Sequence, residues 1–293
     1  MSATILVTGA SGQLGRRVVD HLLDRSGTTI VAGTRDPARL ADLHDRGVEV
    51  RRVDFDDPDS LPSALRGVDR ILVISTDALE RPGARVAQHR RMIDAAAASG
   101  VSHLVYTSMP RPEQSTVLFA PDHVASERAV KESGVPYTIL RVSWYQENLS
   151  RQLPSILATG RWFTSAGDGR VPYVARDDVA RVAAAVLAAG APTHATLDVT
   201  GEQAWSTDEI AELLGRVHGR RIEVEHLDDE TLRAGLIRAG VPAPLADLQV
   251  SLDRNTRLDR LAPPTDIVER LTGAKPRPLE VFVEGISIAA APS

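Results

Sequence analysis

The chain has 293 residues, of which 43% are hydrophobic, and its 34 basic and 39 acidic side chains give a formal net charge of −5. Because it contains no cysteine, a disulfide scaffold, a zinc–thiolate cluster and a thiol nucleophile are excluded, and redox chemistry requires a bound cofactor. We expect no nucleic-acid and no membrane partner, since the sequence has no basic block and no apolar run of about 18 residues. The start of the chain lacks the pattern of a secretory signal, which favours a cytoplasmic protein.

Short β-branched runs alternate with helical patterns along the first half of the chain, which is typical of βαβ units with a parallel sheet. The expected strands are Thr4–Val7, Thr29–Gly33, Val48–Val53, Arg70–Ile74, His103–Thr107 and Tyr137–Val142. Apolar residues at helical spacing between them predict crossover helices that each bury one face. The sequence therefore predicts an α/β protein with a doubly wound, parallel-sheet Rossmann fold, whose NAD(P)-binding core covers residues 1–145.

After about residue 145, Gly and Pro interrupt shorter segments, and we expect a smaller C-terminal α/β lobe over residues 146–293 that binds the substrate. No long linker separates the two parts, so they are expected to pack as one compact unit. The expected elements of this part are helices over Val179–Ala189 and Asp229–Gly240, a helix capped by Ser206 and Glu209, and strands over Thr196–Thr200 and Ile222–His226. The strand near 196–200 is expected to return to the main sheet.

The first expected strand runs directly into a glycine-rich turn, and an amphipathic helix follows it. The spacing is G-x-x-G-x-x-G, in which Gly9 permits a tight turn, Gly12 lets backbone amides approach a pyrophosphate, and Gly15 lets the helix pack close to the strand. As the first βα turn of the chain, this pattern predicts dinucleotide binding, with an empty Rossmann fold as the alternative. The expected cofactor contacts of the turn are Thr8, Gly9, Ser11, Gly12, Gln13, Leu14 and Gly15.

The second expected strand leads to Thr34 and Arg35, at a point where NAD-selective proteins place an acidic residue. A guanidinium can bind a 2′-phosphate through two hydrogen bonds, so Arg35, with Arg39 as a second charge, predicts NADPH rather than NADH. Asp36 could weaken this preference, and a solvated arginine pair is the alternative. The remaining expected cofactor contacts follow three later strands: Asp54 and Phe55 at the adenine, then Ser75 and Thr76, then Thr107 and Ser108.

Aromatic residues are concentrated in one segment of the chain. There are three Trp, four Tyr and four Phe, and five of them lie between positions 144 and 173, where an even spread predicts about one. This segment follows the sixth expected strand, at the carboxyl edge of the sheet where ligands bind, so we expect a flat ring to stack there against the nicotinamide. Packing between the lobes is the alternative. The expected substrate-binding residues are Trp144, Tyr145, Asn148, Trp162 and Phe163.

Five segments occur in this order along the chain: TGASGQLG, TRDP, VDFDD, QHRRMIDAAAASGVSHLVYTS and RVSWYQEN. With them the chain resembles the NmrA-like atypical short-chain dehydrogenase/reductases, in particular their NADPH-dependent quinone oxidoreductase type 2 group. The resemblance extends over nearly the whole chain and includes FTSAGDGRVPYVARDDVA. It implies NADPH as the cofactor and direct hydride transfer to a quinone or a similar flat conjugated carbonyl.

The chain departs from the wider superfamily at the site of proton transfer, where classical members use a tyrosine and a lysine four residues later. No Y-x-x-x-K occurs, and fifteen residues after Ser108 the corresponding positions hold His123 and Glu127. Carbonyl–alcohol interconversion by that route is therefore not expected, whereas a quinone accepts hydride readily once donor and acceptor are positioned. His123 is a candidate proton donor because imidazole titrates near neutrality, with a wall position as its alternative, and Tyr145 is a second candidate catalytic residue.

Other functions stay open beside a quinone reductase. The missing Tyr/Lys pair suits a non-catalytic, NADP(H)-sensing NmrA-like regulator equally well, and the aromatic segment also suits a tailoring reductase of a specialised biosynthetic pathway. The histidines are scattered and no H-E-x-x-H motif occurs, so no metal site is expected. The oligomeric state is left open, with a homodimer among the options.

Overall fold

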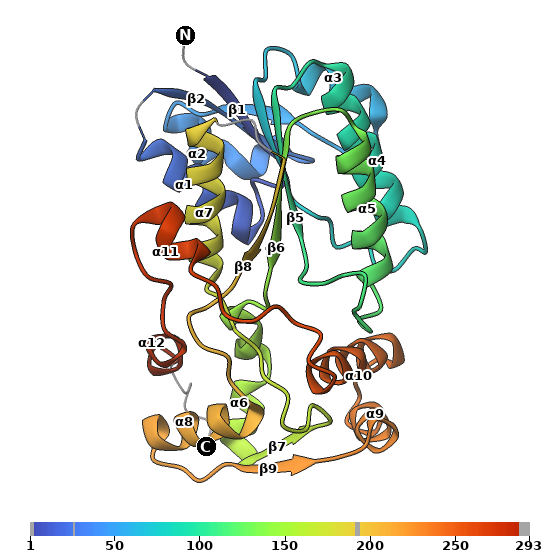
Figure 1. Cartoon of the computed structure of the whole chain (residues 1–293), viewed down its shortest axis with the longest axis vertical. Helices are drawn as coiled ribbons and strands as arrows, with labels where there is room; N and C mark the ends of the chain where they lie inside the picture. Colours follow the sequence, from blue (N-terminus) through green and yellow to red (C-terminus); the bar gives the residue numbers. More distant parts are fainter. Residues whose placement is uncertain (1–2, 26, 191–193, 287–293) are drawn as a thin grey trace.

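The computed structural model describes residues 3–25, 27–190 and 194–286 of the chain. Its main sheet has seven parallel strands in the order β3-β2-β1-β4-β5-β6-β8 (Figure 1). The strands are β1 (Ala3–Val7), β2 (Thr28–Thr34), β3 (Glu49–Arg52), β4 (Arg70–Val73), β5 (His103–Ser108), β6 (Tyr137–Val142) and β8 (Ala195–Val199). The strand order reverses between β1 and β4, and such a switch point is where open α/β sheets bind ligands at the carboxyl ends of their strands.

Helices cover both faces of this sheet, because successive strand side chains point to opposite faces and both faces are apolar (Figure 1). In β1, Ile5 and Val7 belong to one core cluster and Leu6 to the other. One face carries α1 (Gln13–Leu23), η1 (Pro37–Leu40), α2 (Ala41–Asp45), α7 (Arg176–Ala189) and α11 (Ile267–Thr272). The other face carries η2 (Pro58–Ser60), α3 (Leu61–Ala64), α4 (Ala84–Ala98) and α5 (Ala120–Glu132).

A second lobe lies beyond the carboxyl edge of the sheet, in the lower part of Figure 1. Two short parallel strands, β7 (Arg161–Thr164) and β9 (Glu223–His226), form its sheet. Its helices are η3 (Gln146–Arg151), α6 (Leu153–Thr159), α8 (Thr207–His218), α9 (Asp229–Arg238), α10 (Ala243–Arg257) and α12 (Leu279–Glu284). Trp162 and Trp205 lie in its buried core together with apolar residues of η3, α6, α8 and α12.

The structure confirms the expected fold class, a doubly wound parallel sheet with a smaller α/β lobe. Ser206 and Glu209 form the expected capping box at the start of α8, and β8 pairs with β6 in the main sheet. α7 packs against α1 in the core of the main sheet, and α11 packs against α7 and β8, so segments from beyond residue 146 complete that core. No helix in the described ranges is both long and apolar enough to cross a membrane.

Candidate functional site

The glycine turn, residues 8–15, joins the end of β1 to the start of α1. Gly9 has a φ of +61°, a conformation that favours glycine. A Cβ built on Gly15 would overlap the Gly9 carbonyl and lie 2.9 Å from the Ala10 Cα, so only glycine lets α1 approach the turn this closely. No side chain in the described part of the chain caps the amino terminus of α1, and its first turn has no acidic residue, so its backbone amides and dipole suit an anion.

Hydrogen bonds connect the ends of the central strands beside this turn. The Ile74 amide donates to Thr8 Oγ1 at 3.0 Å, and the Ser75 amide donates to Thr107 Oγ1 at 2.9 Å. Thr34 at the end of β2 donates its hydroxyl to Ser11 Oγ at 3.0 Å. The expected cofactor residues of β1, β2, β4 and β5 therefore share one continuous edge, although the Thr8 and Thr107 hydroxyls are used to connect the strands.

Arg35 is exposed directly after β2, and no carboxylate in the described residues pairs with it. The Asp36 carboxylate instead accepts from the Ala38 amide at 3.1 Å and caps η1. The neighbouring acid thus has a local structural partner and does not pair with Arg35. Arg39 is also exposed, one turn further on.

The two residues expected at the adenine occupy different environments. Asp54 is half-buried; one of its oxygens lies 3.3 Å from the Arg52 guanidinium and the other accepts from the Asp56 amide. The Phe55 side chain is 8% exposed and packs into the core cluster beneath α3 and α4. The structure therefore uses most of the Phe55 ring in the core rather than as an open wall of the site.

Glu127, which occupies the position of the superfamily lysine, is buried and connects Ser108 to Arg141 by hydrogen bonds. It accepts from Ser108 Oγ at 2.7 Å and from the Arg141 guanidinium at 2.9 and 2.7 Å. Burial alone would raise the pKa of Glu127, but the hydrogen bonds from Arg141 and Ser108 outweigh it and lower the pKa. Ser108, an expected cofactor residue, is thus held by a charged network that ties the ends of β5 and β6 to α5.

His123 lies in a buried polar cluster formed by Arg85, His89, Tyr106, His123 and Ser126. Its Nε2 accepts from the Arg85 guanidinium at 2.8 Å, because arginine has no acceptor, and its Nδ1 lies 3.2 Å from the Tyr106 hydroxyl. Burial, together with the charge of Arg85, lowers the pKa of His123 well below its usual value. The expectation that His123 titrates near neutrality is therefore wrong, since 3% exposure and an arginine at Nε2 disfavour the imidazolium.

The same cluster holds the end of β4 in place. His89 Nε2 accepts from the Thr76 amide at 2.9 Å, and Arg85 Nε donates to the Thr76 carbonyl at 2.7 Å. Burial lowers the pKa of His89 to about 3, so this acceptor is neutral at ordinary pH. The backbone of Thr76, an expected cofactor residue, is thereby held by the buried side chains of His89 and Arg85.

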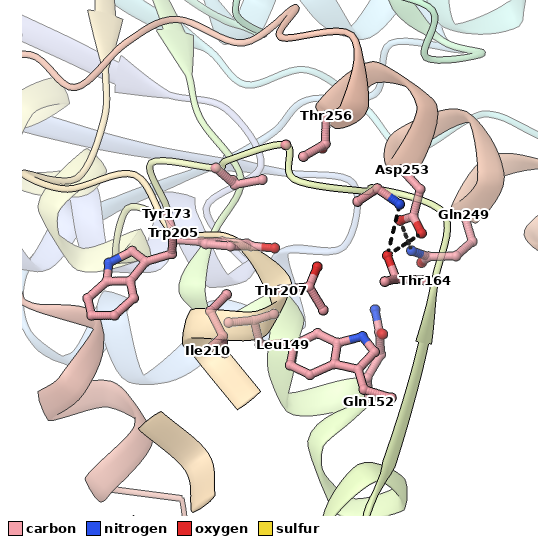
Figure 2. Close-up of a pocket in the computed structure, with 14 residues that line it drawn as sticks. Leu149, Gln152, Thr164, Tyr173, Trp205, Thr207, Ile210, Gln249, Asp253 and Thr256 are labelled. Atoms are coloured by element: carbon pink, nitrogen blue, oxygen red, sulfur yellow. Dashed lines mark hydrogen bonds between the residues drawn. The ribbon is translucent and has the colours of Figure 1, made fainter. Parts of the chain in front are cut away.

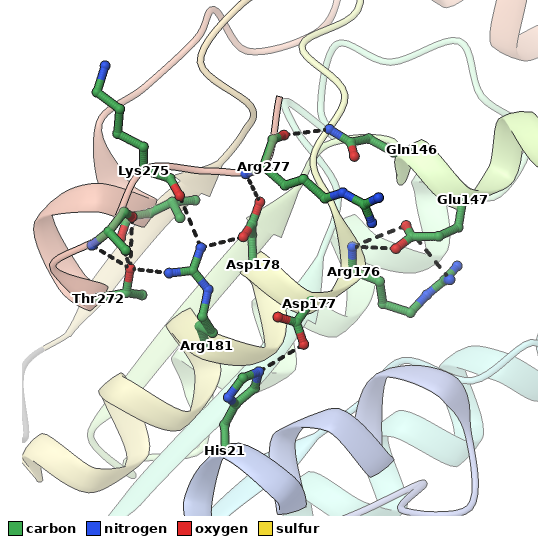
Figure 3. A network of polar contacts seen from close by, with 12 residues as sticks. His21, Gln146, Glu147, Arg176, Asp177, Asp178, Arg181, Thr272, Lys275 and Arg277 are labelled. Atoms are coloured by element: carbon green, nitrogen blue, oxygen red, sulfur yellow. Dashed lines mark hydrogen bonds and ion pairs between the residues drawn. The ribbon is translucent and has the colours of Figure 1, made fainter. Parts of the chain in front are cut away.

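Tyr145 follows β6, and its ring is covered by Arg176, which was not among the expected site residues. The Arg176 guanidinium lies 4.4 Å from the centre of the Tyr145 ring and donates to Gln13 Oε1 of the glycine turn at 2.6 Å. Glu147 accepts from the Arg176 amide at 3.1 Å and so caps the start of α7 (Figure 3). Arg176 therefore connects the glycine turn with Tyr145.

Burial raises the pKa of Tyr145 to about 12, so its hydroxyl carries a proton at neutral pH. Within the described part of the chain no group hydrogen-bonds to this hydroxyl. Trp144 precedes it and meets Phe119 edge to face, with ring centres 6.5 Å apart. Asn148 is exposed one turn further along the chain, and its backbone N–H donates a hydrogen bond to the Tyr145 carbonyl. All three residues follow the end of β6, but the Trp144 ring packs against the small cluster of Met109, Val117 and Ala120, whereas the Tyr145 ring packs against the core cluster that includes α1 and α7.

Trp162 and Phe163 do not join this group. They are neighbours on β7, so their side chains point to opposite sides, and Trp162 is 6% exposed in the second-lobe core. Phe163 is 45% exposed and stacks against the Arg161 guanidinium at the surface. Trp162 also lines a cavity of the second lobe, and Phe163 is not among the residues that line it. The five aromatic residues of the segment are therefore distributed over at least two places.

Comparisons with known proteins find similar chains over nearly the whole length of this one. A family model described as the NmrA-like family matches residues 1–281. Quinone oxidoreductase 2 of Escherichia coli is 33% identical over 97% of each chain. A Streptomyces griseus protein, (4-alkanoyl-5-oxo-2,5-dihydrofuran-3-yl)methyl phosphate reductase, is 35% identical over 94% of each chain.

Solved structures show the same similarity in three dimensions. The crystal structure of an NADPH-dependent quinone oxidoreductase from Escherichia coli, complexed with NADPH, superimposes with a TM-score of 0.90 at 33% identity, over 95% of this chain and 98% of that one. A triphenylmethane reductase from Citrobacter sp., complexed with NADP(H), gives a TM-score of 0.89 at 33% identity, over 96% and 99% of the two chains.

Proposed function

The chain belongs to the NmrA-like family, and from that premise we propose that it is an NADPH-dependent oxidoreductase that transfers a hydride directly to a quinone or a similar flat conjugated carbonyl. The observation that carries the proposal is the glycine turn at the sheet's switch point, with an uncapped helix start and the unpaired Arg35 beside it. Two similar proteins of known structure are complexed with NADPH or NADP(H).

The residues present fit the cofactor. The amide groups at the start of α1 suit its pyrophosphate, and the Arg35 guanidinium suits the 2′-phosphate that distinguishes NADPH from NADH. The nicotinamide half of NADPH would extend along the sheet edge that carries Ser75, Thr76, Thr107 and Ser108. When bound, NADPH supplies the hydride.

Tyr145 is the residue best placed to serve the acceptor. Its hydroxyl is protonated and free of partners in the described residues, so it can donate a hydrogen bond to the acceptor oxygen that becomes negatively charged. Two electrons and one proton reach the acceptor as hydride, and a second proton from Tyr145 or solvent completes the hydroquinone. Trp144 offers an aromatic surface for a flat ring.

The first experiment follows the loss of reduced-nicotinamide absorbance with NADPH and with NADH, in the presence of benzoquinones and naphthoquinones. We expect turnover with NADPH and a clear preference over NADH. Tight NADPH binding by calorimetry without oxidation by any acceptor would instead indicate a cofactor-sensing regulator.

Replacing Trp144 tests the location of the acceptor. We expect Trp144→Ala to raise the KM for the quinone about tenfold, since aromatic contacts of this kind contribute about 1 kcal/mol beyond their buried area. The KM for NADPH should change much less. The opposite pattern would place the acceptor elsewhere.

A tailoring reductase is the second candidate, favoured by the 35% identity to the Streptomyces griseus reductase of a dihydrofuranylmethyl phosphate. The substrate in that protein's name is a conjugated, oxygen-containing ring, which a site of the same aromatic and hydroxyl groups also suits. Turnover of butenolide acceptors with a kcat/KM well above that of every quinone would favour this candidate.

A further inference from the structure

A cavity of about 50 Å³ lies within the second lobe (Figure 2), and none of the residues that line it belongs to the glycine turn. A water needs roughly 10–15 Å³ of such space, so the cavity holds a few water-sized groups. η3, β7, α8 and α10 form its walls. One wall is closely fitted, because a Cβ built on Gly169 would overlap the Thr256 carbonyl of α10.

The charge on the cavity wall comes from one side chain. Among the described residues that line it, Asp253 is the only one with a carboxyl or a basic group, and it is 8% exposed. Asp253 accepts from Thr164 Oγ1 and the Ser165 amide at 2.8 Å each, and from Gln249 Nε2 at 2.9 Å. A carboxylate offers about four acceptor positions, so one remains for a group that donates.

The nearest arginines are engaged elsewhere. Arg254 and Arg257 both bind Asp229 of α9, and neither lines the cavity. Arg257 also donates to the Ser165 carbonyl, and its charge interacts with Asp253 without a direct hydrogen bond to it. Burial raises the pKa of Asp253, and the hydrogen bonds from Ser165 and Thr164 offset only part of this rise. A buried carboxyl without a directly bound cation is costly to ionise, and a positively charged ligand would reduce that cost.

Aromatic side chains complete the cavity wall. Trp162, Tyr173 and Trp205 all line it, and the faces of such rings attract cations, most strongly where water is excluded. Figure 2 shows the Tyr173 hydroxyl directed toward Thr207, and no group in the described residues hydrogen-bonds to it. The wall thus combines a carboxyl, three aromatic rings and an unused hydroxyl.

We propose that this cavity binds a small organic cation of the primary or methylated amine class, which donates an N–H to Asp253 and packs its methyl group against Trp162 and Tyr173. A neutral ligand of the same size would gain the packing but not the charge interaction. The proposal does not depend on hydride transfer, and its test measures binding alone.

The test titrates the full chain with methylammonium chloride and, separately, with methanol, which has the same number of heavy atoms but no charge. Sodium chloride at equal concentration controls for ionic strength. We expect saturable heat and a raised melting temperature with methylammonium in the millimolar range, and neither with methanol. Equal responses to both compounds, or no saturable binding of methylammonium, would overturn the proposal.

Asp253→Asn tests the charge, because asparagine keeps the shape and Gln249 can turn its amide oxygen toward the new NH₂ group. We expect at least a tenfold loss of methylammonium affinity. Asp247→Asn on the same helix is the matched control: that carboxylate pairs with Arg233 at the surface, and its loss should leave the affinity unchanged. If Asp253→Asn does not fold, Tyr173→Phe, which removes one oxygen, is expected to weaken binding several-fold. Unchanged affinity in a folded Asp253→Asn or Tyr173→Phe variant would contradict the proposed contacts.

Discussion

Arg35 lies at the end of β2 with its guanidinium free of any carboxylate in the described residues, so its replacement is a direct test of cofactor choice. We expect Arg35→Ser to raise the KM for NADPH about 10- to 100-fold, since hydrogen bonds to charged groups contribute roughly 1.5–3 kcal/mol. The KM for NADH should hardly change. Arg66→Ser is the matched control, because Arg66 is exposed just before β4, at the opposite edge of the sheet. A parallel rise for both cofactors would show that Arg35 does not contact the 2′-phosphate.

Replacing Tyr145 tests whether its hydroxyl donates to the oxygen of the acceptor. We expect Tyr145→Phe to lower kcat for quinone reduction about tenfold with little change in the KM for NADPH, since it removes one donor to the developing oxyanion. Because the pKa of Tyr145 is raised to about 12, deprotonation of this group should cause no fall in kcat between pH 7 and 10.

Tyr137→Phe is the control for this change, since Tyr137 begins β6 at the far edge of the sheet. An alkaline fall in kcat near pH 9 that disappears in Tyr145→Phe would contradict the protonated role assigned to Tyr145. Activity equal to that of the unaltered protein would show that solvent alone supplies the second proton.

At the scale of elements, the glycine turn depends on how closely α1 approaches β1. Gly15→Ala places a Cβ 2.9 Å from the Ala10 Cα, so α1 must shift and its amides must leave the anion position. We expect cofactor affinity to fall at least tenfold, measured by calorimetry. Gly235→Ala is the control, because its Cβ meets only the tip of Arg238 at 4.0 Å, and alanine should stabilise α9 by about 0.5–1 kcal/mol. Unchanged NADPH binding in Gly15→Ala would mean that the cofactor does not use this turn.

Elements with strong local signals could be predicted from the sequence. The strand, glycine turn and helix at residues 3–23 and the capping box of α8 each depend on residues that are close together in the chain. β7 was missed because its four residues are stabilised by β9, whose partner residues lie about sixty positions later. α10 was missed because Pro242 and Pro244 suggest a loop, although proline is favoured in the first turn of a helix.

The candidate site likewise contains residues that could be predicted from local sequence and residues that depend on distant parts of the chain. The turn, Arg35 and the strand ends follow from local pattern, but the pairing of Arg176 with Tyr145 joins residues 31 positions apart and needs the folded second half. The segment RVSWYQEN indicated Tyr145, and the arginine in the quoted VARDDVA segment was the available signal for its partner. The neutral state of His123 could not be predicted, because it results from burial and from Arg85 on a different helix.

On the scale of the whole molecule, the two parts of the chain share a core. Val179 and Leu187 of α7, and Val268 of α11, pack in the same cluster as Ile5 of β1 and Val18 of α1. The main sheet is therefore incomplete without the second half of the chain, and the two parts are expected to unfold together. Buried ionisable groups in this structure consequently affect the stability of the entire molecule.

Acid should destabilise the molecule through its buried histidines. The folded-state pKa values of His89 and His123 are lowered below the value of about 6.5 expected in the unfolded chain, with that of His89 at about 3. Below pH 6.5 the unfolded state therefore binds protons that the folded state does not. The contribution of the two neutral histidines to the free energy of unfolding is thus complete above pH 6.5 and is lost as the pH falls. Each histidine should lower the free energy of unfolding by about 1.4 kcal/mol per pH unit.

Urea unfolding of the unaltered protein and of His123→Gln at pH 7.5 and pH 5.0 measures this effect. Glutamine can accept from Arg85 and donate to Tyr106 but does not titrate, so the variant should lose about 2 kcal/mol less between the two pH values. His44→Gln is the control, since that side chain is 76% exposed and should leave the pH dependence unchanged. An identical loss in His123→Gln and in the unaltered protein would mean that the pKa of His123 is the same in the folded and the unfolded state, so that burial and Arg85 do not lower it.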